Sequence, residues 1–148
     1  MSRIKIERPE QFHFSCLIPV RITDINYGGH VGNDTVLSII HEARMQFFKY
    51  FGYTEMQFAG TGMIMTDAAI EFRNELFYGD MVIASVMARE FTKVGFELLY
   101  KLEKETLRQD ESAKMVQVVV ATTRMVCYDY EKKKIVTVPD EAKVKLTS

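Results

Sequence analysis

The sequence predicts an α+β protein in which an antiparallel sheet wraps around one long central helix. Three observations lead to this prediction: one long amphipathic segment, a β-rich segment before it, and four β-rich segments after it. The turns between the later segments are short, and short connections join antiparallel neighbours. The 148 residues suffice for one core, so we expect a single domain over residues 1–148.

The chain begins its regular structure with a β-rich segment at residues 13–22, which we expect to form a strand. A polar, glycine-rich stretch follows at residues 23–33 (TDINYGGHVGN). Neither a helical nor a strand periodicity fits this stretch, so it is predicted to be a loop.

Residues 34–51 have the pattern of a long helix. Asp34 is the predicted N-cap, and Gly52 follows the last turn, where a left-handed residue is favoured. The spacing i, i+3, i+4, i+7 predicts that the helix is buried on much of its circumference. The apolar residues at this spacing are Val36, Leu37, Ile40, Ala43, Phe47 and Tyr50.

The remaining segments are predicted to form the sheet. The expected strands cover residues 63–73, 80–92, 94–106 and 114–130, with turns at 78–80, 93–95 and 109–111. Residues 135–138 extend the last strand and Pro139 ends it. Residues 115–126 are apolar at nearly every position, so both faces of the sheet should be covered, one by the helix and one by a second subunit. We therefore expect a homodimer or homotetramer.

Composition and motifs argue against several functions. A net charge of −1 provides no basic surface for nucleic acid, and no apolar run approaches the length of a membrane span. We expect a cytoplasmic protein with no membrane partner. Cys16 and Cys127 match no metal or redox spacing and are expected in the core. The patterns G-x-S-x-G, H-E-x-x-H, C-x-x-C and G-x-G-x-x-G are all missing, so we expect neither metal nor other cofactor.

The glycine-rich stretch before the helix carries the candidate chemistry. Gly28 and Gly29 let the backbone approach a ligand closely. The helix start offers N–H groups without intrahelical partners, which can stabilise a developing oxyanion. The stretch therefore suits polarisation of a carbonyl, although glycine-rich helix starts also bind phosphates.

The same stretch resembles a known family. DINYGGHVGN at 24–33 and HEAR at 41–44 are similar to the D-x-D-x-x-G-H-V-N-N loop and E-E-A-R helix of hotdog thioesterases related to 4-hydroxybenzoyl-CoA thioesterase. FRNE at 72–75 and YGD at 78–80 resemble the family's next strand and turn, and the resemblance spans residues 14–139. It implies a hotdog fold and hydrolysis of an acyl-CoA-type thioester to free acid and CoA.

One position departs from the family pattern. The second aspartate, the nucleophile or general base of the family, is Asn26 here. An amide neither accepts a proton at neutral pH nor attacks a carbonyl as a carboxylate does. We therefore expect Asn26 to position water or the thioester, with Asp24, His30, His41 or Glu42 as the base. His41 and Glu42 differ by about 100° around a helix, so only one of them should face the site.

The predicted substrate-binding residues are Tyr27, Gly28, Gly29, Val31, Gly32, Asn33, Arg73 and Lys93. For Arg73 and Lys93, a solvated side chain is the alternative to a ligand of the CoA phosphates. Structural roles stay open for several residues: Asp24 can bond loop amides, Asn26 can be a turn residue and Arg44 can make a structural salt bridge. Two further functions stay open, a non-catalytic acyl-CoA-binding hotdog protein and a hotdog dehydratase or hydratase.

Overall fold

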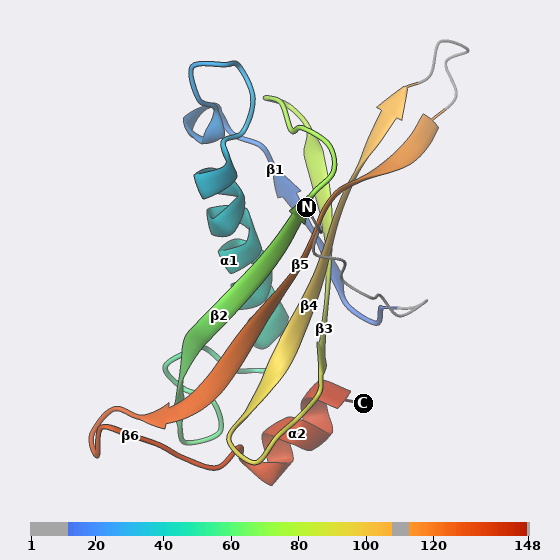
Figure 1. Ribbon diagram of the computed structural model, residues 1–148. Helices are drawn as coiled ribbons and strands as arrows, with labels where there is room; N and C mark the ends of the chain where they lie inside the picture. Colours follow the sequence, from blue (N-terminus) through green and yellow to red (C-terminus); the bar gives the residue numbers. More distant parts are fainter. Residues whose placement is uncertain (1–11, 108–112, 148) are drawn as a thin grey trace, which may run out of the picture.

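The computed structural model describes residues 12–107 and 113–147. Figure 1 shows a twisted antiparallel sheet with a long helix lying along one face. In chain order the elements are β1 (Ser15–Pro19), the 3-10 helix η1 (Ile22–Asp24), α1 (Asn33–Tyr50), β2 (Gly62–Phe72), β3 (Met81–Arg89), β4 (Gly95–Leu107), β5 (Ala113–Asp129), β6 (Lys134–Ile135) and α2 (Asp140–Thr147). The strand order is β1-β3-β4-β5-β2, and β6 pairs with β5.

The predicted helix is present as α1, and its start needs one correction. Gly32, not Asp34, is the N-cap, because its extended backbone (φ −73°, ψ 159°) leads into the first turn. The Gly32 carbonyl accepts the N–H groups of Thr35 and Val36, both at 3.1 Å. Gly52 follows the helix with a φ of +85°, as the sequence predicts.

The core lies between α1 and the sheet. The helix buries one apolar face, and Phe48 contacts Phe58 and Phe96 with ring centroids 5.6 and 6.4 Å apart. Ile40 is 1% exposed and Phe47 is 2% exposed. Val36, Ile40, Ala43 and Phe47 of the predicted apolar stripe hold α1 against the sheet. Leu37 and Tyr50, predicted to belong to the same stripe, are 45% and 69% exposed.

The predicted strands differ from the observed ones by a few residues at their ends. The segment at 13–22 contributes only Ser15–Pro19, because the chain turns into η1 at Ile22. The predicted extension at 135–138 forms the short strand β6 over Lys134–Ile135, and the next N–H, that of Val136, donates to the Cys127 carbonyl of β5 at 3.0 Å. The turn expected at 109–111 lies outside the described residues.

A second helix, α2, was not predicted. It buries only Ala142 and Leu146, and two positions are too few to give a recognisable helical period. Leu146 lines a cavity together with Phe47 and Phe51 of the C-terminal end of α1. Figure 1 places α2 at the end of the sheet far from the glycine-rich loop.

The face of the sheet away from α1 is more polar than the sequence suggested. Arg89 on β3 pairs with Glu97 on β4 at 2.7 Å, and Lys101 lies 3.5 Å from Glu103. Leu99 occupies the same face of β4 between these charges and is fully buried. Lys101 Nζ also lies 5.1 Å from the centroid of the Phe12 ring.

Strand β2 forms one edge of the sheet and pairs only with β5 among the described strands. Residues 65–68 along it are exposed, and the register shifts between Met65 and Asp67. A long exposed edge presents unpaired backbone groups to another chain. Among the described helices, neither has the length and apolar character that crossing a membrane requires.

Candidate active site

The start of α1 is the centre of the candidate site. Its first N–H groups, those of Asn33 and Asp34, have no intrahelical partner, and no side chain of the N-cap residue covers them. A Cβ on Gly32 would lie 2.7 Å from Asp34 Oδ1 and 3.4 Å from Asn26 Nδ2, so both polar side chains flank this helix start. The positive end of the helix dipole adds to the field at these N–H groups.

The glycine-rich loop folds back on itself before it enters α1. Asn26 N–H donates to the His30 carbonyl at 3.0 Å, and Gly29 N–H donates to the Asn26 carbonyl at 3.1 Å. Asn26 Oδ1 accepts the Gly28 N–H at 2.9 Å. Gly29 has a φ of +81°, a conformation that favours glycine. Asn26 is therefore built into the turn, as the structural alternative for this residue predicts.

His30 is held with one ring nitrogen facing outward. Its Nδ1 lies 3.1 Å from the Val31 carbonyl oxygen, which can only accept a hydrogen bond. Nδ1 therefore carries the hydrogen in the neutral ring, and the lone pair is on Nε2. This Nε2 lies 3.8 Å from Glu75 Oε1. A Cβ added to Gly28 would lie 3.3 Å from His30 Nε2 and 3.3 Å from Asn26 Oδ1, so both of these atoms are close to Gly28.

A cleft of about 260 Å³ opens between this loop, the first turn of α1 and the loop after β2. Its apolar side comprises Val31, Val36, Phe72, Leu76, Val118 and Val119. Its polar side comprises His30, Asn33, Arg73, Asn74 and Glu75. An apolar cavity with a few convergent polar groups is the usual form of a small-molecule site.

The family model described as the thioesterase-like superfamily matches residues 20–146. The chain belongs to the thioesterase-like superfamily. The hotdog fold predicted from the sequence is confirmed by this match and by the antiparallel sheet around α1.

Solved structures with the same fold include two CoA thioesterases and a hypothetical protein. A 1,4-dihydroxy-2-naphthoyl-CoA thioesterase from Synechocystis has a TM-score of 0.76 and 16% identity, covering 91% of this chain and 96% of its own. A gentisyl-coenzyme A thioesterase has a TM-score of 0.74 and 17% identity, and the match covers 90% of this chain and 99% of that protein. A hypothetical protein from Aquifex aeolicus has a TM-score of 0.75 and 23% identity, and the match covers 90% of this chain and 98% of that protein. No curated protein matches the chain.

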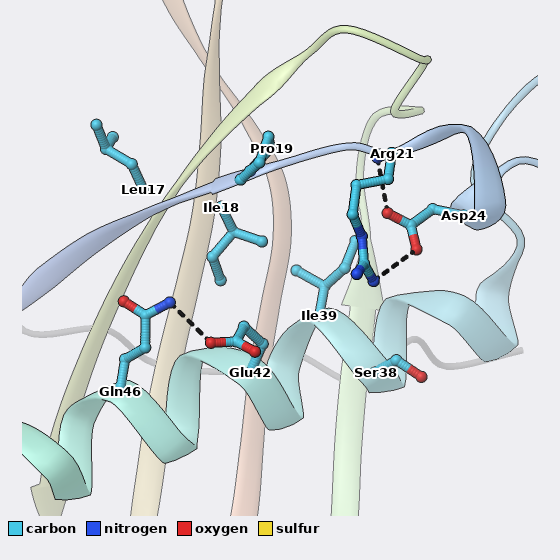
Figure 2. Close-up of a pocket in the computed structure, with 9 residues that line it drawn as sticks. All are labelled: Leu17, Ile18, Pro19, Arg21, Asp24, Ser38, Ile39, Glu42 and Gln46. Atoms are coloured by element: carbon cyan, nitrogen blue, oxygen red, sulfur yellow. Dashed lines mark hydrogen bonds and ion pairs between the residues drawn. The ribbon is translucent and has the colours of Figure 1, made fainter.

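Two of the candidate bases lie on the other flank of α1. This superfamily member has a second cavity, of about 310 Å³, between β1 and α1, where Asp24 and Glu42 are found (Figure 2). Asp24 is 7% exposed, and it accepts the Arg21 backbone N–H at 2.8 Å. Glu42 accepts a hydrogen bond from Gln46 at 2.8 Å. Neither carboxylate lines the cleft that holds His30 and Asn33.

Cys16 on β1 lies beside the same flank of α1. Burial, followed by the nearby Glu42 carboxylate, raises the pKa of the Cys16 thiol to about 11. A thiol with so high a pKa is a poor nucleophile at neutral pH. This supports its predicted structural role.

His41 lines neither of these two cavities. Its Nε2 lies 3.2 Å from Glu55 Oε1, which also accepts Arg44 Nε at 2.8 Å. The sequence predicted that one of His41 and Glu42 faces the site, but neither lines the cleft that holds His30 and Asn33. Arg44 makes the structural salt bridge expected of it, and its NH1 reaches the buried Tyr100 hydroxyl at 3.4 Å. Burial raises the pKa of the Tyr100 phenol, against the opposing attraction of the Arg44 guanidinium.

The predicted substrate-binding residues divide into two groups. Val31, Asn33 and Arg73 line the cleft. Arg73 is held there by Glu71 at 2.7 Å and Gln117 at 2.8 Å. Gly28, Gly29 and Gly32 shape the loop, and the Tyr27 side chain is fully exposed.

Lys93 lies outside the cleft. It lies in the turn between β3 and β4, where its carbonyl accepts the Val138 N–H at 2.9 Å. Figure 1 shows this turn at the end of the sheet near α2. Because β3 has nine residues, the two ends of this strand are about 30 Å apart.

Sequence reasoning missed Glu75 and Asn74, which also line the cleft. The FRNE segment at residues 72–75, which resembles the family pattern, contains both residues, but only Arg73 of this segment was predicted to bind substrate. The described residues contain no group of three or more His, Cys, Asp or Glu side chains placed to hold a metal ion.

Proposed function

We propose that this protein hydrolyses an acyl-CoA-type thioester to free acid and CoA without a cofactor. The observation that supports the proposal is the cleft lined by both His30 and Asn33, the first residue of α1, whose N-cap residue makes no side-chain hydrogen bond. Membership of the thioesterase-like superfamily supports the same reaction class. The names of the two CoA thioesterases among the similar structures favour a CoA ester over other thioesters.

In the proposed reaction, the thioester carbonyl oxygen accepts hydrogen bonds from the backbone N–H groups of Asn33 and Asp34. Water adds to the carbonyl carbon while His30 Nε2 takes its proton, which gives an oxyanion and an imidazolium. The tetrahedral intermediate then collapses, and the C–S bond breaks. The imidazolium returns its proton to the departing sulfur, so the products are the acid and the CoA thiol.

His30 is the base in this proposal because the other candidates are engaged elsewhere. Asp24 bonds Arg21, Glu42 bonds Gln46, and His41 lies against Glu55. Asn26 holds the turn through Gly28 rather than acting on water. The role that the family gives to an aspartate is thus assigned to an imidazole four residues later.

We also propose that the protein is a homodimer in which β2 pairs with β2 of a second copy. The eleven residues of this edge strand, four of them exposed in a row at 65–68, support this arrangement. The cleft borders the end of β2 through Phe72, so pairing there would bring the second copy beside the site. The two free cysteines fit the proposed cytoplasmic location, where thiols stay reduced.

The proposal is tested by incubating the protein with acyl-CoAs of graded chain length and with aromatic acyl-CoAs, and by measuring release of the CoA thiol. His30→Gln should lower kcat by about 10² to 10⁴, the usual contribution of a general base. His41→Gln is the matched control, since His41 lies outside the cleft, and it should keep wild-type activity. Full activity in His30→Gln would refute this assignment. Binding of acyl-CoA without hydrolysis would support the non-catalytic alternative instead.

A further inference from the structure

We infer that Glu75 is a positioning residue for the proposed hydrolysis and acts by stabilising the imidazolium of His30. This inference rests on the proposed function, and it concerns a residue for which the family pattern in this sequence gives no role. Glu75 Oε1 lies 3.8 Å from His30 Nε2, and both side chains line the cleft at the start of α1.

The orientation of His30 makes this contact selective for one protonation state. Nδ1 is committed to the Val31 carbonyl, so the nitrogen that faces Glu75 is the one that takes the proton from water. A carboxylate has little attraction for the lone pair of a neutral ring. It attracts the imidazolium strongly, so the contact grows as the proton is transferred.

The backbone around Glu75 is anchored on both sides. The next residue, Leu76, is 1% exposed and accepts the Val31 N–H at 2.8 Å. The Glu75 carbonyl accepts Lys104 Nζ at 2.7 Å, and the same Nζ lies 2.9 Å from Asp80 Oδ2. These bonds keep Glu75 opposite the histidine.

The other charged groups near the cleft have partners or face elsewhere. The Arg73 guanidinium is bound by Glu71 and Gln117, which keeps its charge from pairing with Glu75. The Asp34 carboxylate lies over Gly32 at the helix start. Among the residues that the structure describes, Glu75 is the acidic side chain within 4 Å of a His30 ring nitrogen.

The size of the effect follows from exposure. The Glu75 side chain is 62% exposed and that of His30 is 34% exposed, so water screens the pair. Exposed ion pairs of this kind correspond to about a two- to fivefold change in rate when they form only in the transition state. Because the stabilisation is absent with neutral histidine, it should change kcat and leave KM unchanged.

The test compares Glu75→Gln, Glu75→Asp and wild type at the pH of maximal activity, using the acyl-CoA that the wild type hydrolyses fastest. Glu75→Gln should lower kcat about two- to fivefold at low salt, with KM and melting temperature unchanged. Glu75→Asp retains the charge and should recover part of the loss. The difference between wild type and Glu75→Gln should shrink at 1 M salt, where screening acts over about 3 Å.

The matched control is Glu90→Gln. Glu90 is 66% exposed and lies 4.0 Å from Arg124, a similar loose ion pair, and it is not among the residues of the cleft. This variant should keep the wild-type kcat. An active wild type with an unchanged kcat in Glu75→Gln, or an equal loss in Glu90→Gln, would overturn the role of Glu75 and leave the proposed function intact. A wild type that hydrolyses no thioester would overturn both.

Discussion

Replacing Asn33 with proline removes one proposed oxyanion donor without removing the helix. Asn33 is the first residue of α1, where proline is favoured because its missing N–H has no intrahelical partner. The residue before a proline must be extended, and Gly32 already has φ −73° and ψ 159°. The side chain of Asn33 is exposed, so the substitution removes little packing.

We expect Asn33→Pro to lower kcat by about 10² to 10³, the cost of losing one oxyanion donor. The free energy of unfolding should change by less than about 0.5 kcal/mol, because the site is at the surface. Hydrolysis is measured as release of the CoA thiol, and stability is measured by thermal unfolding. Asn33→Ala is the matched control, since it removes the side chain and keeps the N–H, and it should retain kcat near wild type.

Two results would contradict this reasoning. Wild-type kcat in Asn33→Pro, with an unchanged melting temperature, would show that this N–H does not contact the carbonyl. An equal loss in Asn33→Ala would transfer the effect from the backbone to the side-chain amide. Either result would move the carbonyl away from the position proposed here.

Three further predictions concern stability and assembly. Ile40→Asp should lower the free energy of unfolding by about 3–5 kcal/mol in denaturant titrations, because it buries an unpaired charge. Leu37→Asp, on the exposed side of α1, is the control and should lower it by less than about 1 kcal/mol. Equal losses would contradict the packing of α1. Arg44→Met leaves Glu55 and the Tyr100 hydroxyl without this partner and should lower the free energy of unfolding by about 3–5 kcal/mol. A decrease below about 1 kcal/mol would show that these contacts contribute little to stability. Light scattering at micromolar concentration should give twice the 17.1 kDa of the chain, and a value of 17.1 kDa would exclude the β2 pairing.

The sequence was a good guide to the elements whose periodicity is strong. The apolar stripe from Val36 to Tyr50 identified α1, and the β-rich runs identified the four long strands, because burial of one face dictates the spacing. The N-cap was misplaced because Asp34 has the favoured side chain, whereas the backbone of Gly32 makes the turn. Helix α2 was missed because only two of its residues are buried.

The candidate site was predictable only where it is local in the chain. The glycine-rich loop, His30 and Asn33 are close in sequence, so one motif identified them. The contact between His30 and Glu75 depends on the pairing of Val31 with Leu76, 45 residues later, which no local pattern encodes. For the same reason, the sequence predicted the turn that contains Lys93 but not the end of the sheet at which this turn lies.

The hydrogen bond from the Val31 N–H to the Leu76 carbonyl joins the glycine-rich loop to the loop that carries Glu75. Opening the cleft must break this bond, whereas the buried centre of the sheet can remain intact. The exchange of the Val31 amide hydrogen with solvent therefore reports local opening separately from global unfolding. Any molecule that binds in the cleft and holds the two loops together should slow this exchange, even if it is never turned over.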